Sequence, residues 1–600
     1  MHDPFDNQVS RDVWLAKYCL RDETGPLETS VDESWRRVAD AVASVEGAAA
    51  EKWAGRFYDL LCDFRFLPGG RILAGAGSSH QVTLFNCFVM GTIEDSMDGI
   101  FTALKEGALT MQQGGGVGYD FSTLRPRGAP ARHAGTISSG PVSFMRIWDS
   151  MCETLLSTGN RRGAMMATLR CDHPDIESFI EVKRDPRELR NFNLSVLVTD
   201  EFMQAVKCDR EWPLRFPLLP DEEPVACEEA RWSGREGAVS CRVYARVSAR
   251  KLWRRIMRAT YDMAEPGVLF IDHINRENNL HYCERIEATN PCGEIPLPPY
   301  GACDLGSLNL TAYVLEPFTS KAAFDETRFR QDVAVAVRFL DNVIELSRFP
   351  LASQQRQAGA TRRIGLGATG LADVLMMLGM RYGDERSLNW VDTLFRLLRD
   401  TAYQASCELA QEKGAFPRFR SGDYLAGAYS RRLPPELRQR IARGGMRNSH
   451  LLAVAPTGTI SLLANNVSSG LEPVFDYSYR RSLRGADGSL KQVELEDYAW
   501  RLWRSRERDA APIHFVTASD IAPEDHLAIQ ARIQPYVDNA ISKTINVPES
   551  IEFEHFSSLY QQAYLLGLKG CTTFRPNAIR GEVLSSGTAS RSTESCCMTD

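Results

Sequence analysis

Three side chains that could do chemistry alternate along one short segment, Asn290-Pro291-Cys292-Gly293-Glu294. In an extended or looped backbone, every second side chain projects to the same side, so an amide, a thiol and a carboxylate would face one space. The proline fixes one backbone angle, and the glycine lets a ligand or another part of the chain come close. Taken alone, the segment fits both a reactive loop and an ordinary turn that contains a cysteine.

Four other cysteines favour the reactive loop. Cys303 follows Cys292 by eleven positions, Cys87 lies in a short apolar run, and Cys596 and Cys597 are adjacent near the end of the sequence. Fifteen cysteines without a signal peptide or a Cys-x-x-Cys pair predict a reducing, cytoplasmic setting with a few catalytic thiols. The same pattern argues against a disulfide framework and against a structural zinc site.

The composition of the whole chain excludes several function classes. A hydrophobic fraction of 44% and a charged fraction of 24% are typical of a globular protein. The net charge of −7 argues against a broad electrostatic contact with nucleic acid, so nucleotide phosphates would have to be held locally. No stretch of about 18 apolar residues occurs, and the start of the chain is charged, so we expect neither a membrane span nor a signal peptide.

Together with the cysteine segment, seven further segments resemble the ribonucleotide reductases, and in particular their adenosylcobalamin-dependent class II. In order, they are 84–89 (LFNCFV), 114–118 (GGGVG), 161–166 (RRGAMM), 171–175 (CDHPD), 191–195 (NFNLS), 456–461 (PTGTIS) and 570–576 (GCTTFRP). The resemblance extends from about Val9 to Arg580. It implies an α/β fold of the ribonucleotide reductase and glycyl radical enzyme type: a ten-stranded barrel, built from two five-stranded parallel halves set antiparallel, with the cysteine loop inside.

We expect three regions in the chain: a helical region over 1–80, the barrel with its specificity loops over 81–580, and a flexible redox tail over 581–600. Residues 31–53 have helical spacing, whereas 82–90, 193–198 and 451–455 read as buried strands. The tail is rich in Ser, Thr and Gly, which is typical of a mobile segment. Because no ATP-binding cone precedes the helical region, we expect no overall-activity switch.

The resemblance implies a role for each of five residues. Cys292 would carry a thiyl radical that abstracts the 3′ hydrogen of a ribonucleotide, and Glu294 would take the 3′-hydroxyl proton as general base. Asn290 would hydrogen-bond the hydroxyl groups of the substrate. Cys87 and Cys303 would protonate the leaving 2′-hydroxyl and supply two electrons as they form a disulfide.

The tail cysteines, Cys596 and Cys597, would then reduce this disulfide by thiol exchange, with thioredoxin or glutaredoxin as the external reductant. Many relatives have Cys-x-x-Cys in the tail, and the adjacent pair departs from that pattern. Two alternatives therefore stay open: the pair is the working shuttle, or a further C-terminal segment or a companion chain carries it.

The resemblance also implies nucleotide sites. A deoxynucleoside triphosphate effector would be held by Asp95, Arg125 and Arg132, since a carboxylate suits a ribose hydroxyl and guanidinium groups suit phosphates. The loop that relays the identity of the effector to the substrate would be Asn160, Arg161, Arg162, Gly163, Ala164 and Met165. The substrate phosphates would lie, without any lysine, at a helix start formed by Pro456, Thr457, Gly458, Thr459, Ile460 and Ser461. Because relatives bind the effector at a subunit contact, we expect a homodimer.

Two other patterns are interpreted as structural. The segment Gly365-Leu366-Gly367-Ala368-Thr369-Gly370 fits the dinucleotide fingerprint, but the residues before it are polar and do not form the required strand. We therefore expect a tight entry into a helix over 371–379. The charged stretch 221–236 predicts a surface insertion without a catalytic role.

The source of the radical separates the classes of the family. Thr572 and Thr573 stand where class I enzymes have two adjacent tyrosines, and no Arg-Val-x-Gly-Tyr segment of the glycyl radical class is present. This leaves adenosylcobalamin, which carries its own cobalt, so we expect no metal site in the protein. The expected reaction is the reduction of ribonucleoside diphosphates for DNA synthesis, although triphosphate substrates stay open. A class I large subunit and a nucleotide-binding regulatory protein without catalysis are the alternatives.

Overall fold

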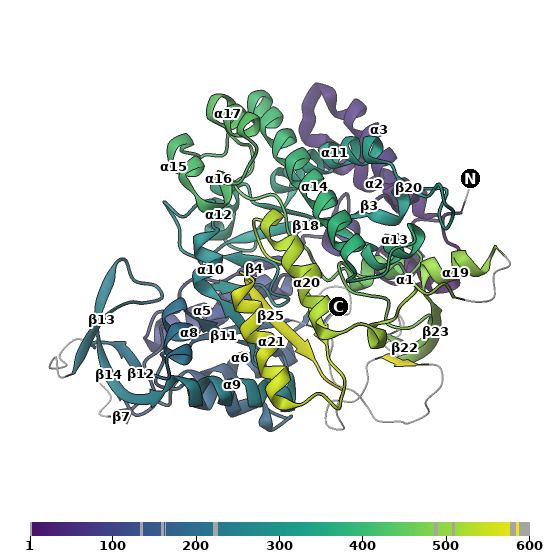
Figure 1. The fold of residues 1–600 in the computed structure, drawn as a ribbon. Helices are drawn as coiled ribbons and strands as arrows, with labels where there is room; N and C mark the ends of the chain where they lie inside the picture. Colours follow the sequence, from purple (N-terminus) through teal and green to yellow (C-terminus); the bar gives the residue numbers. More distant parts are fainter. Residues whose placement is uncertain are drawn as a thin grey trace.

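The computed structural model describes residues 3–131, 136–157, 161–162, 164–219, 226–484, 490–506, 511–576 and 584–586. Five of the residues singled out above, Arg132, Asn160, Gly163, Cys596 and Cys597, lie outside these ranges. Figure 1 shows a mixed α/β molecule in which strands occupy the centre and helices surround them, with the N-terminal helices gathered on one side.

The N-terminal region is helical, as predicted. Its main helices are α1 (Gln8–Lys17), α2 (Val31–Ala43) and α3 (Ala50–Leu61). Helix α2 begins after Ser30 with two acidic residues in its first turn, which favours a helix start, and it buries Trp35 and Val38 on one face. Phe57 of α3 contacts Phe339 of α11 (Glu326–Leu346) with ring centroids 5.2 Å apart, so this region packs directly on the barrel helices.

The first half of the barrel consists of five parallel strands that neighbour one another in chain order. They are β4 (Cys87–Val89), β5 (Gly116–Asp120), β10 (Met165–Arg170), β11 (Phe192–Val198) and β15 (Gly267–Phe270). All six residues of β10 are buried, as expected for a parallel strand with both faces covered. Helices α5 (Met97–Gln112) and α6 (Pro141–Thr154) lie in the crossovers on either side of β5.

The second half is a matching parallel set, and it closes the ring. Its strands are β18 (Ala302–Asn309), β21 (Ile364–Thr369), the segment 451–455, β24 (Thr544–Asn546) and β25 (Gly570–Phe574). The segment 451–455 joins the ring through two single bridges, Leu452 with Leu366 and Val454 with Ile541. The halves meet antiparallel where β18 pairs with β4 and β15 pairs with β25. The predicted ten-stranded barrel of two opposed halves is therefore confirmed.

The glycine-rich segment is followed by the expected helix, but most of the segment is a strand and not a helix entry. Its first five residues form strand β21, and only Gly370, with φ of 79°, caps the following helix α13 (Leu371–Met377). A Cβ on Gly367 would lie 2.2 Å from the carbonyl oxygen of Ala453, so the glycine is needed where two barrel strands approach closely. The polar stretch before it is helix α12 (Ala352–Thr361).

The charged stretch 221–236 is not a simple surface insertion in its described part. Strand β13 (Cys227–Arg231) pairs with β14 (Ala238–Ser248), and the side chain of Trp232 is only 2% exposed. The guanidinium of Arg170 lies 4.6 Å from the Trp232 ring, and the N–H of Gly234 donates to both carboxylate oxygens of Glu287 at 2.9 and 3.1 Å. Aromatic burial and these hydrogen bonds fasten the stretch to the barrel.

A short part of the tail also pairs with the body of the protein. Strand β26 (Leu584–Ser586) lies along β22 (Ser478–Arg484), which in turn pairs with β23 (Leu490–Glu496). Backbone pairing places these three residues at a sheet edge. None of the described helices combines the length and the apolar character that a bilayer crossing requires.

Candidate active site

The alternating segment forms the tip of a short hairpin. Strands β16 (Ala288–Thr289) and β17 (Pro296–Leu297) pair antiparallel, and 290–295 connects them. The side-chain oxygen of Asn290 accepts the N–H of Ile295 at 2.9 Å, and its backbone oxygen accepts the N–H of Gly293 at 3.1 Å. Gly293 has φ of 83°, a left-handed conformation that favours glycine. The asparagine thus closes the loop, in addition to facing the site.

The hairpin lies inside the barrel and contacts both halves. A Cβ on Gly118 of β5 would lie 1.8 Å from the carbonyl oxygen of Thr289, and one on Gly116 would lie 3.2 Å from Cγ of Pro291. These glycines let the hairpin backbone lie directly against the first half. From the other half, the N–H of Ala540 donates to the backbone oxygen of Glu294 at 2.9 Å.

The five candidate catalytic residues lie together around this hairpin. Cys87 of β4 and Cys303 of β18 are directly opposite each other where the two halves meet. The amide of Asn290 donates to Sγ of Cys87 at 3.2 Å, and that thiol donates to Oε1 of Glu294 at 3.7 Å. Cys292 is the exposed thiol of the group, and its charge is among those that raise the pKa of Cys87. The described cysteines are all free thiols.

The electrostatics of the site set the protonation of its groups. Burial raises the pKa of Glu294 to about 7, although hydrogen bonds from Asn290 and from Cys87 partly offset this. Burial also raises the thiol pKa of Cys87 and of Cys303, with further contributions from Glu294 and from Asp304 respectively. Both thiols therefore keep their protons at neutral pH, and the carboxyl group titrates near neutrality. This set can donate protons, accept one, and form a disulfide.

One acceptor in the site has no internal partner. Oε2 of Glu294 is buried, and no donor in the described part of the chain reaches it. A buried carboxylate oxygen without a donor is costly, so such an atom points to a ligand that supplies the missing hydrogen bond. Its partner atom Oε1 is already engaged by Cys87, and Oε2 is the free acceptor.

The expected phosphate segment adopts a tight turn into helix α18 (Gly458–Leu463), with Thr457 at φ of 51°. The hydroxyl of Thr457 contacts those of Thr369 and Ser461 at 2.9 and 3.0 Å and accepts the N–H of Gly470 at 2.7 Å. These buried hydroxyls fix the turn. Of the predicted hydroxyl groups, that of Thr459 lies outside this network.

A lysine side chain reaches this turn, which the sequence did not indicate. Nζ of Lys17, at the end of α1, donates to the hydroxyl of Thr459 at 3.4 Å. Helix α1 is held against α18 by Ser10, whose hydroxyl donates to the backbone oxygen of Leu462 at 2.6 Å. Lys17 and Thr459 are 442 positions apart, and no local pattern in the sequence indicates their contact.

Two of the three expected effector residues lie together. Asp95 and Arg125 form an ion pair at 2.8 Å, and the backbone N–H of Arg125 also donates to Asp95 at 3.1 Å. In the expected specificity loop, β9 (Arg161–Arg162) pairs with β8 (Leu156–Ser157), and Met165 begins β10. The carbonyl oxygen of Ala164 accepts the N–H of Val117 at 3.1 Å, so the end of the loop is hydrogen-bonded to β5, the strand that contacts the hairpin.

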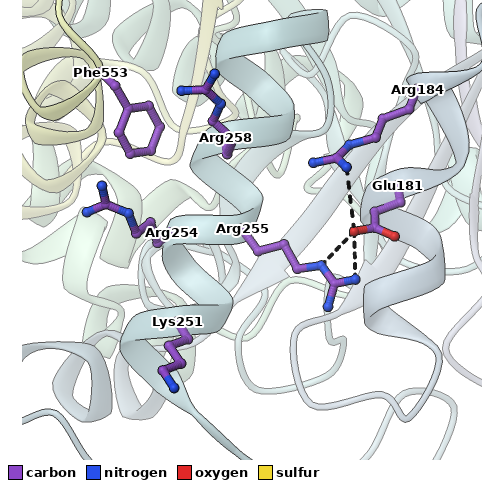
Figure 2. Close-up of a pocket in the computed structure, with 7 residues that line it drawn as sticks. All are labelled: Glu181, Arg184, Lys251, Arg254, Arg255, Arg258 and Phe553. Atoms are coloured by element: carbon purple, nitrogen blue, oxygen red, sulfur yellow. Dashed lines mark hydrogen bonds and ion pairs between the residues drawn. The ribbon is translucent and has the colours of Figure 1, made fainter.

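A surface hollow of about 360 Å³, away from the hairpin, is lined mostly by basic residues (Figure 2). Basic side chains of α9 (Ala249–Met263) line it, together with Phe553. Arg255 pairs with Glu177 and Glu181 at 2.7 and 2.6 Å, and carboxylates thus already occupy its guanidinium. None of the lining residues belongs to the hairpin, the phosphate turn or the barrel strands. We therefore assign no nucleotide to this hollow.

Among the described residues, no group of three or more His, Cys, Asp or Glu side chains could hold a metal ion.

The barrel with its internal cysteine hairpin defines a class of enzyme, and comparison with known families identifies it. Residues 85–574 match the family model described as ribonucleotide reductase, barrel domain, and residues 5–81 match ribonucleotide reductase, all-alpha domain. The chain therefore belongs to the ribonucleotide reductase family and is an oxidoreductase. This membership disfavours the alternative of a regulatory protein without catalysis.

Three named relatives are similar to this chain over most of its length. The vitamin B12-dependent ribonucleoside-diphosphate reductase of Mycobacterium tuberculosis (strain CDC 1551 / Oshkosh) is 38% identical over 598 residues, which cover 96% of this chain and 80% of that protein. The protein of the same name from Thermoplasma acidophilum is 34% identical, covering 91% and 68%. The ribonucleoside-diphosphate reductase subunit alpha of Chlamydia pneumoniae is 27% identical, covering 91% and 56%.

Proposed function

We propose that this chain reduces ribonucleoside diphosphates to 2′-deoxyribonucleoside diphosphates with adenosylcobalamin as its radical source. The observation that carries the proposal is the pair of protonated thiols, Cys87 and Cys303, directly opposite each other beside the Cys292 hairpin. The names of the relatives from M. tuberculosis and T. acidophilum support both the cofactor and the diphosphate substrate.

The surroundings of Cys292 fit this cofactor. When bound, adenosylcobalamin supplies a 5′-deoxyadenosyl radical by homolysis of its Co–C bond. Cys292 is exposed, and a Cβ on Gly293 would meet no atom within 4 Å, so the space over the loop tip is open. Thr572 is exposed, while the hydroxyl of Thr573 is 3.0 Å from that of Tyr560. Neither threonine can relay a radical from a partner subunit, which disfavours class I.

Each of the five residues has a proposed task on the sugar. The thiyl radical of Cys292 takes the hydrogen atom from C3′, and Oε2 of Glu294 takes the 3′-hydroxyl proton. Asn290 hydrogen-bonds the hydroxyl groups. Cys87 and Cys303 provide the proton with which the 2′-hydroxyl leaves as water. In the balance of the reaction, a ribonucleotide and two thiols give a deoxyribonucleotide, water and one disulfide.

The nucleotide contacts are proposed at the places described above. The turn at Pro456, Thr457, Gly458, Thr459, Ile460 and Ser461 would bind the substrate phosphates through backbone N–H groups of the helix start, with Lys17 adding a positive charge. Asp95, Arg125 and Arg132 would bind a deoxynucleoside triphosphate effector at a homodimer contact. The loop of Asn160, Arg161, Arg162, Gly163, Ala164 and Met165 would carry its identity to the substrate base. We further propose a cytoplasmic location.

The experiment that tests the proposal is reduction of CDP by the purified protein with dithiothreitol, with and without adenosylcobalamin. We expect dCDP only when the cofactor is present. Hydroxocobalamin has no Co–C bond that could form the radical. It is therefore the matched control and should give no product. CTP as a parallel substrate decides between diphosphate and triphosphate. Product formation without any cobalamin would contradict the proposal, as would a folded protein that makes no dCDP with the intact coenzyme.

We also propose that Cys596 and Cys597 reset the disulfide. The last described residue of the tail is Ser586, which pairs with Tyr479 of β22. The hydroxyl of Tyr479 donates to Asn466 at 3.0 Å, close in the chain to the phosphate turn. The ten residues from Ser586 to Cys596 span at most about 35 Å when extended, which sets the limit on how far Cys596 can lie from Ser586.

Replacing both tail cysteines by serine should separate the two reductants. With thioredoxin as the only reductant, we expect about one turnover per chain, because a protein cannot enter the barrel and the disulfide stays formed. Dithiothreitol is small enough to enter and should restore many turnovers. The measurement is dCDP formed per chain with each reductant. Normal turnover with thioredoxin alone would show that another segment or a companion chain is the shuttle.

A further inference from the structure

One hydrogen bond connects a barrel strand to the peptide that carries the radical thiol. The side-chain amide of Asn193, in β11, donates to the carbonyl oxygen of Pro291 at 2.8 Å. Its strand neighbours Phe192 and Leu194 are buried in the main hydrophobic core outside the barrel. Because strand side chains alternate, Asn193 projects to the opposite face, which is the barrel interior.

We propose that Asn193 is a positioning residue, whose bond to Pro291 fixes the location of the Cys292 thiol. The inference rests on the proposed function. Other hydrogen bonds also hold the loop, among them those from the Ile295 N–H to the Asn290 side chain and from the Ala540 N–H to the backbone oxygen of Glu294. These two bonds are made to residues on either side of Cys292, and neither is made to the Pro291 carbonyl. Asn193 anchors the peptide that contains this carbonyl, between a proline that has no N–H and a left-handed glycine.

The position of this thiol matters because it must meet two partners in turn. Hydrogen-atom transfer requires the sulfur to lie close to the donor carbon and in line with it, first for the radical source and then for C3′ of the sugar. A displacement of about 1 Å can slow such a step by roughly 100-fold. A bond to a backbone oxygen fixes the loop without placing any group on the substrate, so its loss should change the rate and not the binding of CDP.

Asn193 also stands next to the expected specificity loop. In the pairing of β10 with β11, Asn193 is opposite Met166, one residue after the end of that loop at Met165. Asn193 thus lies in the β10–β11 pair, where the expected specificity loop enters β10. Its side chain also contacts the hairpin that carries Cys292. A shift of β11 relative to β10 would be transmitted to the Pro291 carbonyl through one hydrogen bond.

The test compares Asn193→Leu and Asn193→Asp, which keep the approximate shape but not the neutral amide donor, with Asn191→Leu. Asn191 is the matched control, since its amide donates to Asp149 on α6 at 3.2 Å and not to the hairpin. We expect both Asn193 variants to lose roughly 100-fold in kcat for CDP while KM stays within about twofold. The Asn191 variant should keep both values near those of the wild type.

A second measurement needs neither cofactor nor turnover. Amide hydrogen exchange of the hairpin 288–297, and the rate at which iodoacetamide alkylates Cys292, should both rise in the two Asn193 variants and stay unchanged in Asn191→Leu. If Asn193→Leu keeps both the hairpin amide exchange rate and the kcat of the wild type, the inference is overturned. Equal changes of these two quantities in Asn191→Leu would overturn it too. If the wild-type protein makes no dCDP, the proposed function fails, whereas the exchange result still decides whether Asn193 anchors the hairpin.

Discussion

Cys292→Ser is expected to abolish all formation of deoxynucleotide, including the first turnover, with thioredoxin or with dithiothreitol. The thiol is proposed to carry the radical, and a serine hydroxyl in its place does not form the radical that abstracts the 3′ hydrogen. Because Cys292 is exposed at the loop tip and the loop is closed by Asn290, the substitution should leave the fold intact. The measurement is dCDP formed per chain from CDP in the presence of adenosylcobalamin.

The control for this prediction is Cys283→Ser. Cys283 is also an exposed thiol, and it lies nine positions before Cys292, outside the hairpin. This variant should reduce CDP at the wild-type rate. The variant with both tail cysteines replaced is a second comparison. Dithiothreitol should restore turnover to that variant, whereas it should not restore turnover to Cys292→Ser. One full turnover by Cys292→Ser would show that another residue carries the radical.

Glu294→Gln is expected to lower kcat for CDP by roughly 10² to 10⁴-fold, the usual range for loss of a general base, with little change in KM. The wild-type rate should rise with pH through about 7, since burial raises the pKa of Glu294 to about 7 and only the ionised form accepts a proton. The glutamine variant should lack this limb. The measurement is kcat between pH 5.5 and 8.5, and an unchanged profile in the variant would contradict the role.

The same titration has a consequence for stability. The carboxyl group binds its proton more tightly in the folded protein than in the unfolded chain. Its contribution to stability is therefore fully present below the ordinary carboxyl pKa and is lost as pH rises through about 7. The loss amounts to roughly 3 kcal/mol for a shift of this size. Glu294→Gln should remove this dependence and unfold at a temperature that varies less between pH 5 and 8.

Glu287→Gln provides the matched control. Glu287 stands just before the same hairpin, and burial, followed by the charge of Asp120, also raises its pKa to about 7. Its two oxygens accept the N–H of Gly234. This variant should keep the pH limb of the rate, which assigns that limb to Glu294. Loss of the limb in both variants would mean that titration near the hairpin, rather than proton abstraction, controls the rate.

The architecture was predicted from the resemblance to the ribonucleotide reductases, which implied the ten-stranded barrel and the hairpin inside it. Short apolar strands such as 193–198 are consistent with that fold but do not by themselves specify it. The segment 451–455 also reads as a buried strand in the sequence, but no local pattern shows which strands it joins through the single bridges at Leu452 and Val454. The specific errors arose where a residue is chosen for a partner far away in the chain.

Gly367 shows how such an error arises. A glycine in a fingerprint pattern suggests a turn, whereas here it allows the backbone of Ala453 to come close to a strand. Trp232 and Gly234 appear in a charged stretch, yet their partners are Arg170 and Glu287 in the barrel. Nothing near Lys17 in the sequence indicates its contact with Thr459, which exists only because α1 packs on α18. In each case the chemistry of the residue is visible in the sequence and its neighbour is not.

The placement of Cys87 and Cys303 links the redox state of the site to the stability of the fold. They face each other across one of the two joints between the halves of the barrel, at a spacing that antiparallel neighbours share with disulfides. If turnover oxidises them, the new bond closes a loop of roughly two hundred residues, which constrains the unfolded chain by about 5 kcal/mol in a chain-entropy estimate. Reduction of the sugar would therefore add a cross-link that stabilises the fold, and arrival of electrons would remove it. The catalytic cycle would then also be a cycle of stability against unfolding, with the oxidised protein as the more stable form.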